Sequence, residues 1–372
     1  MENSVLNVNI PSSSACSYPI IIKGGCILSA DEIIPSYVEY SKAVVITNTK
    51  VDALYSAKFN LNAEKIVIDD GEQFKSFETY KKIIDKMVEL NIQRSDVVVA
   101  LGGGVVGDIA GFAAATYMRG IKFVQVPTTL LAQVDSSVGG KVAINLEQGK
   151  NLVGAFYQPQ LVLSDTEVLK TLDERELKSG LGEVVKYAFI EKTCGSKTHY
   201  EQSLFDFLYQ NAERILNLDD AVLPEMIRRC CELKAAVVNA DEKEKGLRAI
   251  LNFGHTFAHA VEKCTNYTQV THGEAVAAGM EMALELSKKL NLISNELFDE
   301  SLNLIKKFGL DFDFSRLSKV TLEEFLSSVK HDKKSEQNYT KFILANGRGE
   351  CVIENISNYD LIREIVVKYV GK

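Results

Sequence analysis

Short apolar runs alternate with amphipathic segments over roughly the first 165 residues of the chain. The runs are rich in β-branched residues, which is typical of buried strands. They predict strands at Val44–Thr47, Ile66–Ile68, Val97–Leu101, Phe123–Val126 and Leu161–Ser164. The clearest helix is predicted in FETYKKIIDKMVEL, where four apolar residues recur at helical spacing: Phe77, Tyr80, Ile84 and Met87. Such an alternation predicts a parallel α/β sheet.

The pattern becomes almost entirely helical from Thr171 onward. In the segment TLDE, Thr171 precedes Glu174 by three residues, which predicts a capping box at the start of the first helix. The segment KFILANGRGECVIE predicts one short hairpin around Asn346-Gly347. A chain of 372 residues favours two domains. We therefore expect an α/β domain over residues 1–165 and a mainly α-helical domain over residues 166–372.

Composition and charge exclude several classes of protein. The net charge is −8, and Lys and Arg are scattered, so the chain has no broad basic surface for a nucleic acid or an anionic membrane. Its seven cysteines show no CxxC spacing, which argues against a disulfide framework or a zinc ribbon. No signal peptide and no apolar run of about eighteen residues occur. We expect a cytoplasmic protein with reduced thiols.

A glycine-rich turn joins a predicted strand to a predicted helix in VVVALGGGVVGDIAGFAAAT. Such a turn lets backbone N–H groups approach a phosphate at a helix N-terminus. The alternative is a tight turn that needs glycine for a positive φ. A Rossmann fingerprint would also show an acidic residue about twenty positions later, where this chain has Val126 and Pro127. Asp108 either complements the helix dipole or has a functional role.

A second polar stretch, VPTTLLAQVDSSVGGKVAINLEQGKNLVGAFYQP, follows this turn. It carries Asp135, Lys141, Lys150 and Asn151 close to the glycine pair 139–140. Two lysines and an asparagine on glycine-rich turns form a plausible local anion pocket. A lone surface lysine, by contrast, is usually solvated and would indicate nothing.

Three of the five histidines, His255, His259 and His272, fall within eighteen positions. Helical spacing places His255, His259 and Glu262 opposite the apolar face of their helix, so a metal site, a substrate pocket and a solvated face all remain open. HTFAH has the histidine spacing of a zincin but lacks its glutamate, which disfavours a zinc protease. A catalytic zinc needs three protein ligands and one open position.

Glu183 and Lys186 also point away from the apolar stripe of their helix, ERELKSGLGEVVKYAFI. An exposed ion pair between them, worth a few tenths of a kcal/mol, is the simpler interpretation. Gly180 and Gly182 in the same helix weaken it, however, and suggest that another element approaches closely.

Together these segments resemble the 3-dehydroquinate synthase family, in register from roughly Gly71 to Met280. The resemblance is carried by GEQFKS, GGGVVGDIAGFAAATYMRG, VPTTLLAQVDSSVGGKVAINLEQGKNLVGAFYQP, GLGEVVKYA, KAAVVNADEKEKGLRAILNFGHTFAHAVE and HGEAVAAGM. It implies a Rossmann-like NAD-binding α/β domain followed by an all-helical C-terminal domain. The implied enzyme is a phosphate-eliminating lyase of the shikimate pathway that leads to chorismate and the aromatic amino acids. It would convert 3-deoxy-D-arabino-heptulosonate 7-phosphate to 3-dehydroquinate and phosphate with catalytic NAD⁺ and Zn²⁺ or Co²⁺, as a cytoplasmic homodimer.

The resemblance also implies roles for individual residues. Glu183, His255 and His272 would hold the metal, and His259 would be a pocket residue. The groups that bind the substrate or act on it would be Asp135, Lys141, Asn151, Lys186, Lys234, Arg248, Asn252 and His259, with Arg119 reaching the neighbouring subunit's site. The NAD⁺ contacts would be Glu72, Lys75, Gly103, Gly104, Asp108, Thr128, Thr129, Lys141, Lys150 and Thr171. A late lysine of the family falls on Lys333 or Lys334, although the following SEQNYT departs from the family pattern.

Three alternatives compete with this assignment. Sugar-phosphate cyclases that make 2-deoxy-scyllo-inosose or valiolone-type products vary the segments GGGVVGD and VDSSVGGK, which this chain keeps in the dehydroquinate synthase form. A glycerol-dehydrogenase-like enzyme would release NADH and present a different set of metal ligands. Loss of a ligand or of a pocket lysine would favour a non-enzymatic NAD-binding or scaffold protein, and none is lost.

Overall fold

The structure is a computed structural model that describes residues 4–8, 17–195, 200–244, 246–266, 269–331 and 339–370. The chain forms two compact units, one of Met1–Leu172 with Asp220–Asn239 and the other of Asp173–Asp219 with Ala240–Lys372. This division into units differs from the predicted one, which had a single boundary after residue 165. The short helix η5 (Thr166–Thr171) stays in the first unit because Val168 is buried in its core. Helix α7 (Leu223–Ala240) returns to that unit almost entirely, which helical spacing alone cannot reveal.

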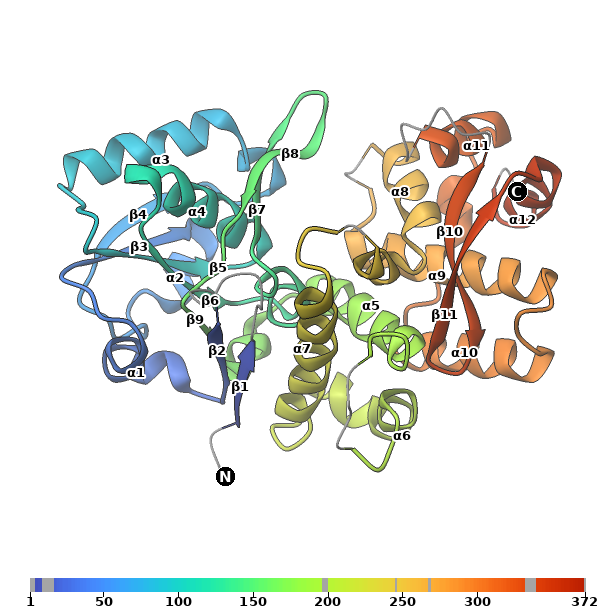
Figure 1. Cartoon of the computed structure of the whole chain (residues 1–372), viewed down its shortest axis with the longest axis horizontal. Coiled ribbons are helices and arrows are strands. Elements are labelled where there is room, and N and C mark those ends of the chain that lie inside the picture. The colour runs from blue at the N-terminus through green and yellow to red at the C-terminus, as the bar shows by residue number, and fades with distance from the viewer. Residues whose placement is uncertain are drawn as a thin grey trace. The chain divides into compact units, whose positions relative to one another are not determined.

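The first unit is built on a seven-stranded sheet with the order β1-β2-β9-β6-β5-β3-β4 (Figure 1). All five predicted strands are present, as β3 (Ala43–Asn48), β4 (Glu64–Ile68), β5 (Val97–Gly102), β6 (Lys122–Pro127) and β9 (Leu161–Ser164). They pair in parallel with one another and, through β9, with β2 (Tyr18–Ile22). Strand β1 (Ser4–Val8) adds antiparallel to β2 at the edge. The predicted parallel α/β sheet is therefore confirmed.

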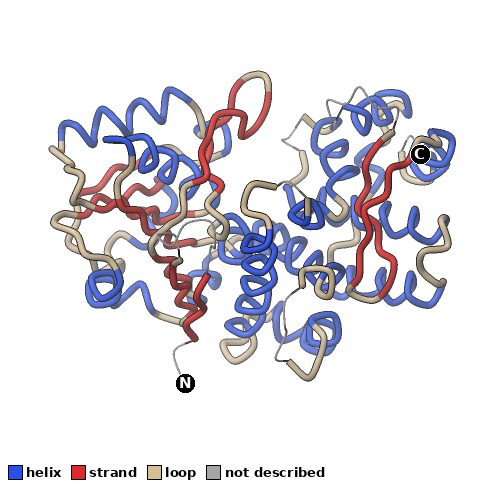
Figure 2. The backbone as a smooth tube through the Cα atoms, in the orientation of Figure 1, coloured by secondary structure: helices blue, strands red, loops and turns tan. Residues whose placement is uncertain are grey.

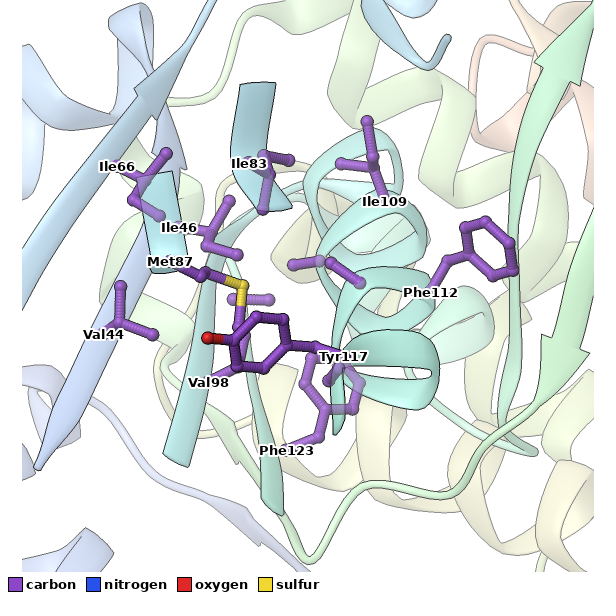
Figure 3. Close-up of a cluster of buried hydrophobic side chains, with 14 of the residues drawn as sticks. Val44, Ile46, Ile66, Ile83, Met87, Val98, Ile109, Phe112, Tyr117 and Phe123 are labelled. Atoms are coloured by element: carbon purple, nitrogen blue, oxygen red, sulfur yellow. The ribbon is translucent and has the colours of Figure 1, made fainter. Parts of the chain in front are cut away.

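Helices cover both faces of this sheet. Helices α3 (Phe77–Glu89) and α4 (Gly104–Thr116) pack on the side chains of Val44, Ile46 and Val98 (Figure 3). The alternate residues Val45, Val97 and Val99 face the opposite cluster, with α1 (Ala30–Tyr37) and α2 (Thr49–Tyr55). This alternation follows from the two-residue period of a strand.

The predicted apolar stripe of α3 is wrong at Phe77, its first residue. Ile83 and Met87 are fully buried, and Tyr80 and Ile84 pack partly against the core. The side chain of Phe77 is 48% exposed, however, because the buried stripe begins at Thr79 instead.

Beyond the sheet, the first unit carries a hairpin of β7 (Lys141–Leu146) and β8 (Gly149–Phe156) that was not predicted. Strand β7 packs against α4, and Val142 and Ile144 join its core. The short helices of this unit are η1 (Cys26–Ser29), η2 (Glu72–Phe74), η3 (Tyr117–Arg119) and the π-type η4 (Ala132–Ser136).

The second unit is mainly helical, as predicted. Its helices are α5 (Glu174–Ile190), α6 (Leu204–Leu216), η6 (Leu247–Asn252), α8 (His255–Cys264), α9 (His272–Lys289), α10 (Asn295–Lys307), η7 (Phe314–Leu317), α11 (Leu322–His331) and α12 (Tyr359–Val367). Two strands, β10 (Thr340–Gly347) and β11 (Glu350–Ile356), form the predicted hairpin and qualify the all-helical expectation (Figure 2). The chain turns at Arg348-Gly349 rather than at Asn346-Gly347, because the register shifts after Ala345 and Gly349 takes a φ of 74°.

The predicted capping box at Thr171 is wrong. Helix α5 begins after Asp173, and the Thr171 hydroxyl instead lies against the Tyr55 hydroxyl and donates to the carbonyl of Val168 at 3.1 Å. A complete capping box does form at α9, between Thr271 and Glu274. It makes His272 the first residue of that helix. No helix among the described residues is both long and apolar enough to span a membrane.

Candidate functional site

Glu183, His255 and His272 come from three helices of the second unit that pack backbone to backbone. A Cβ on Gly182 of α5 would lie 2.7 Å from the carbonyl oxygen of Gly273 on α9. A Cβ on Gly279 of α9 would lie 2.1 Å from the carbonyl oxygen of Gly254, which precedes α8. Only glycine permits such approaches. The close approach that the mid-helix Gly182 predicted is therefore confirmed, and the approaching element is α9.

The three side chains converge on one point. The Nε2 atoms of His255 and His272 lie 3.4 Å and 3.2 Å from Oε1 of Glu183. One donor atom from each residue lies within 4.8 Å of the other two. Two imidazole nitrogens and a carboxylate oxygen in this arrangement are a donor set that suits a divalent metal with an open coordination position.

Hydrogen bonds on the far side of each imidazole fix its orientation. Nδ1 of His255 lies 3.1 Å from the carbonyl oxygen of Phe253. Nδ1 of His272 lies 3.3 Å from Oε1 of Glu262. Both rings therefore turn their Nε2 atoms toward Glu183. Glu262 was noted on the histidine face of its helix, but nothing in the sequence gave it a role.

The sequence left open whether the polar faces of α5 and α8 are solvated or form a site, and burial decides this question. The side chains of Glu183 and Lys186 are each only 2% exposed and form a direct ion pair, so the exposed-pair interpretation is wrong. His255 and Glu262 are also buried, which excludes a solvated face at those positions, whereas His259 is half-buried. The polar residues Glu183 and Lys186 of α5 and His255 and Glu262 of α8 are therefore interior groups.

Electrostatics keeps the Glu183 carboxylate ionised. Burial alone would raise the pKa of Glu183, but the Lys186 ammonium and the two imidazoles hold it well below its usual range. Burial lowers the pKa of His255 despite the neighbouring carboxylate. An anionic carboxylate and a neutral imidazole are the forms that coordinate a metal.

The remaining predicted residues of the second unit lie on the same elements. The rings of His255 and His259 have centroids 5.6 Å apart on consecutive turns of α8. Arg248 and Asn252 belong to η6, directly before α8. Arg248 is 1% exposed, and its guanidinium donates to the carbonyl oxygen of Glu242 at 2.5 Å. A guanidinium stays charged when buried, so it is suited to hold an anionic group.

In the first unit, the glycine turn joins β5 to α4 as predicted. A positive φ is not the reason why glycine is needed at Gly103. Gly103 is the N-cap residue with a φ of −74°. Space is the constraint, because a Cβ on Gly103 would lie 2.9 Å from Thr129 and one on Gly102 would lie 2.6 Å from Val106. The first backbone N–H groups of α4 therefore begin at residues without side chains, which suits an approaching phosphate.

A buried lysine links this turn to the β7–β8 hairpin. Nζ of Lys75 donates to Oδ2 of Asp108 and to Oδ1 of Asn151, each at 2.5 Å. Burial raises the pKa of Asp108, and the neighbouring Lys75 opposes that rise. Asn151 adopts a left-handed φ of 57° in this cluster. The structure thus brings three of the predicted residues together around one ammonium group.

Asn145 belongs to the same cluster and was not predicted. Its Nδ2 donates to Oε1 of Glu72 at 2.7 Å, its Oδ1 accepts from the backbone N–H of Asn151 at 2.9 Å, and its own N–H donates to the carbonyl of Lys75 at 2.7 Å. Its carboxamide therefore ties the hairpin to the turn at η2. Helical or strand periodicity carries no signal for such a role.

The other predicted residues of the first unit are more dispersed. Lys234 on α7 pairs with Asp135 at 2.8 Å and donates to its backbone carbonyl at 2.6 Å. Thr128 and Thr129 follow β6, beside the glycine turn. Lys141, Lys150 and Thr171 are exposed, and so is Arg119, which has a left-handed φ of 67°. Lys333 and Lys334 lie outside the described residues.

Comparisons with known proteins agree with this organisation. The family model for the N-terminal part of 3-dehydroquinate synthase matches residues 65–179, and the model for its C-terminal part matches residues 180–335. A 3-dehydroquinate synthase of Thermoanaerobacter pseudethanolicus is 44% identical over 93% of this chain and 96% of its own. One of Francisella tularensis subsp. tularensis is 46% identical over 96% of this chain and 97% of its own.

Solved structures with the same fold include two of the alternative classes considered above. A 2-deoxy-scyllo-inosose synthase complexed with carbaglucose-6-phosphate, NAD⁺ and Co²⁺ has a TM-score of 0.85 and 26% identity, over 99% of this chain and 100% of its own. A 2-epi-5-epi-valiolone synthase of Streptomyces hygroscopicus with NAD⁺ and Zn²⁺ bound has a TM-score of 0.83 and 24% identity, over 97% and 99%. A probable glycerol dehydrogenase of Sinorhizobium meliloti, with a TM-score of 0.64 and 16% identity over 99% and 98%, shares the fold alone.

Proposed function

Since this chain belongs to the 3-dehydroquinate synthase family, we propose that it catalyses the reaction of that family. The reaction of the family converts 3-deoxy-D-arabino-heptulosonate 7-phosphate to 3-dehydroquinate and phosphate. The first unit binds NAD⁺, and the second holds the metal. The observation that carries this proposal is the convergence of Glu183, His255 and His272 within 4.8 Å.

The donor set of the second unit fits the metals of the related cyclases. Glu183 contributes a carboxylate oxygen, and His255 and His272 contribute Nε2 atoms that lie 3.4 Å and 3.2 Å from it. Three protein donors with one open position are typical of catalytic zinc, and cobalt accepts the same ligands. We therefore assign Zn²⁺ or Co²⁺ to this trio.

Residues around the glycine turn fit NAD⁺. Helix α4 begins at glycines, so a pyrophosphate can approach the backbone N–H groups of its first turn. The Lys75 ammonium is hydrogen-bonded to Asp108 of the same helix. The contacts assigned to NAD⁺ are those of Glu72, Lys75, Gly103, Gly104, Asp108, Thr128, Thr129, Lys141, Lys150 and Thr171. When bound, NAD⁺ supplies a reversible hydride acceptor and the metal supplies a Lewis acid.

Lysine and arginine side chains can neutralise the negative charge of the substrate, which is a phosphate ester that also bears a carboxylate. The protein as a whole is acidic, so recognition must come from nearby groups. Lys186 and Arg248 contribute buried positive charges from the second unit, and Lys141 and Lys234 contribute charges from the first. Asp135, Asn151, Asn252 and His259 are polar groups suited to orient hydroxyls, and Asp135 and His259 can also carry protons.

We expect the purified protein, given NAD⁺ in catalytic amount and a divalent metal, to release phosphate from the heptulosonate phosphate and to form 3-dehydroquinate without accumulating NADH. The reason is that NAD⁺ is regenerated within each turnover. Phosphate release and absorbance at the NADH band can be followed in parallel. Net NADH formation would favour a dehydrogenase, and inertness toward this substrate would favour another cyclase product.

The Asn145 cluster provides a prediction for the cofactor site. Asn145→Ala removes two side-chain hydrogen bonds, each worth about 1 kcal/mol net, and frees Glu72 from the hairpin. We expect the Kd for NAD⁺ to rise at least about fivefold. Asn60→Ala, which removes an exposed hydrogen bond to Asp31 in the same unit, is the matched control. Equal NAD⁺ affinity of both variants in a fluorescence titration would contradict the assignment.

We also propose that the chain acts as a homodimer in the cytoplasm, with Arg119 extended toward the site of the neighbouring subunit. This proposal rests on the family resemblance. It is supported by the exposure of Arg119 and Met118 and by the left-handed backbone that both residues adopt in η3, directly after α4.

A further inference from the structure

We propose that Glu262 is a positioning residue for the metal centre, and that it holds the His272 ring so that Nε2 presents its lone pair to the ion. This inference deepens the proposed function and rests on its assignment of the metal to Glu183, His255 and His272. Glu262 itself contributes no ligand atom.

The geometry at His272 fixes which nitrogen can bind the metal. Oε1 of Glu262 lies 3.3 Å from Nδ1, on the opposite side of the ring from Glu183, whose Oε1 lies 3.2 Å from Nε2. A neutral imidazole carries one proton on its two nitrogens. An anionic acceptor at Nδ1 draws that proton to Nδ1 and leaves the Nε2 lone pair free toward the trio.

The two histidines achieve the same orientation by different means. Nδ1 of His255 faces the backbone carbonyl of Phe253, which the turn at Gly254 brings back toward it. His272 opens α9, and its Nδ1 faces a side chain from another helix instead. Glu262 lies seven residues after His255 and hence on the same face of α8. Helix α8 therefore supplies one ligand and orients the second.

Burial of the Glu262 carboxylate strengthens this contact. Glu262 is 6% exposed, and a carboxylate at that depth is costly unless charged or polar groups compensate it. In such surroundings a carboxylate–imidazole hydrogen bond is stronger than it would be in water. Partners of this kind beyond the direct ligands commonly contribute a factor of about 10–100 to metal affinity.

The test is Co²⁺ binding to the metal-free full-length chain, measured by competition with a chelator and by the visible absorption of the bound ion. We expect Glu262→Ala to weaken Co²⁺ binding about 10–100-fold. Glu262→Gln keeps an acceptor oxygen but loses the charge, so we expect a smaller loss of roughly tenfold. Both variants should also shift the absorption bands, because the coordinating nitrogen becomes less basic.

Glu281→Gln is the matched control. Glu281 lies on α9 with His272, but nine residues later and hence about 13 Å along the helix axis, and it is half-buried. We expect it to leave the affinity and the spectrum unchanged. Denaturant unfolding of each metal-free variant shows whether it still folds. If Glu262→Ala does not fold, the Co²⁺ affinity of Glu262→Gln tests the proposal instead.

His272→Ala separates failure of this inference from failure of the metal site. If His272→Ala abolishes binding while both Glu262 variants retain the wild-type Kd and spectrum, the role of Glu262 is overturned and the metal site stands. If His272→Ala binds Co²⁺ as the wild type does, the metal assignment fails, and the role of Glu262 fails with it.

Discussion

His272→Ala is expected to release the metal and to lower turnover by roughly 10³-fold or more. The substitution leaves only Glu183 and His255 of the three donors that converge, and two ligands do not retain a catalytic ion in competition with a chelator. A Lewis-acid metal supplies several kcal/mol to the transition state, and 1.36 kcal/mol corresponds to a factor of ten. Metal content after dialysis and steady-state turnover are the two measurements.

His259→Ala is the control, since His259 lies on the next turn of α8 but outside the converging trio. It should lose activity through its proposed contact with the substrate and still bind one metal ion. NAD⁺ affinity should be unchanged in His272→Ala, because the proposed cofactor residues lie in the first unit. Full metal occupancy in His272→Ala would refute the ligand assignment.

Lys186→Ala is expected to destabilise the metal-free protein by about 3–5 kcal/mol, as for other buried ion pairs that lose one partner. The Glu183 carboxylate is 2% exposed and would remain in the interior without its ammonium partner. Urea unfolding of the metal-free chain measures the loss. Adding Glu183→Gln to the same chain should recover most of it, because no uncompensated charge then remains.

Lys192→Ala is the comparison for an exposed pair. Lys192 contacts Glu350 at 2.9 Å, but the two side chains are 59% and 47% exposed. Its loss should cost at most about 1 kcal/mol. If Lys186→Ala and Lys192→Ala unfold at the same urea concentration, the buried pair does not carry the stability assigned to it.

The sequence predicts the central strands well because their apolar runs are continuous. Val97–Leu101 is buried on both faces, as parallel strands between helices are, and its β-branched residues distinguish it from a helix. The β7–β8 hairpin was missed because its strand Gly149–Phe156 is largely exposed and rich in glycine. An exposed strand carries little apolar periodicity.

Tertiary contacts explain the errors in detail. The Thr171 hydroxyl is hydrogen-bonded to the hydroxyl of Tyr55, 116 residues earlier in the chain, and no local sequence pattern predicts that contact. The spacing of Glu183 and Lys186 is the same whether the pair is exposed or buried. Here the pair is buried, and the neighbouring Gly182 packs against Gly273 of α9.

The candidate site was only partly accessible to reasoning from helical faces. Periodicity placed His255 and His259 together, yet the structure brings His255 to His272 and Glu183, from two other helices. The family resemblance supplied that grouping. Glu262 and Asn145 were missed because each contacts the site only through another side chain, and such contacts exist only after the chain has folded.

Anomalous X-ray diffraction at the zinc absorption edge, on crystals of the zinc-loaded protein, can locate the metal relative to Glu183, His255 and His272. We predict a single strong peak about 2.0–2.2 Å from a Glu183 carboxylate oxygen and from Nε2 of His255 and of His272. A zinc-saturated crystal whose anomalous peaks all lie away from these three side chains would contradict the metal assignment.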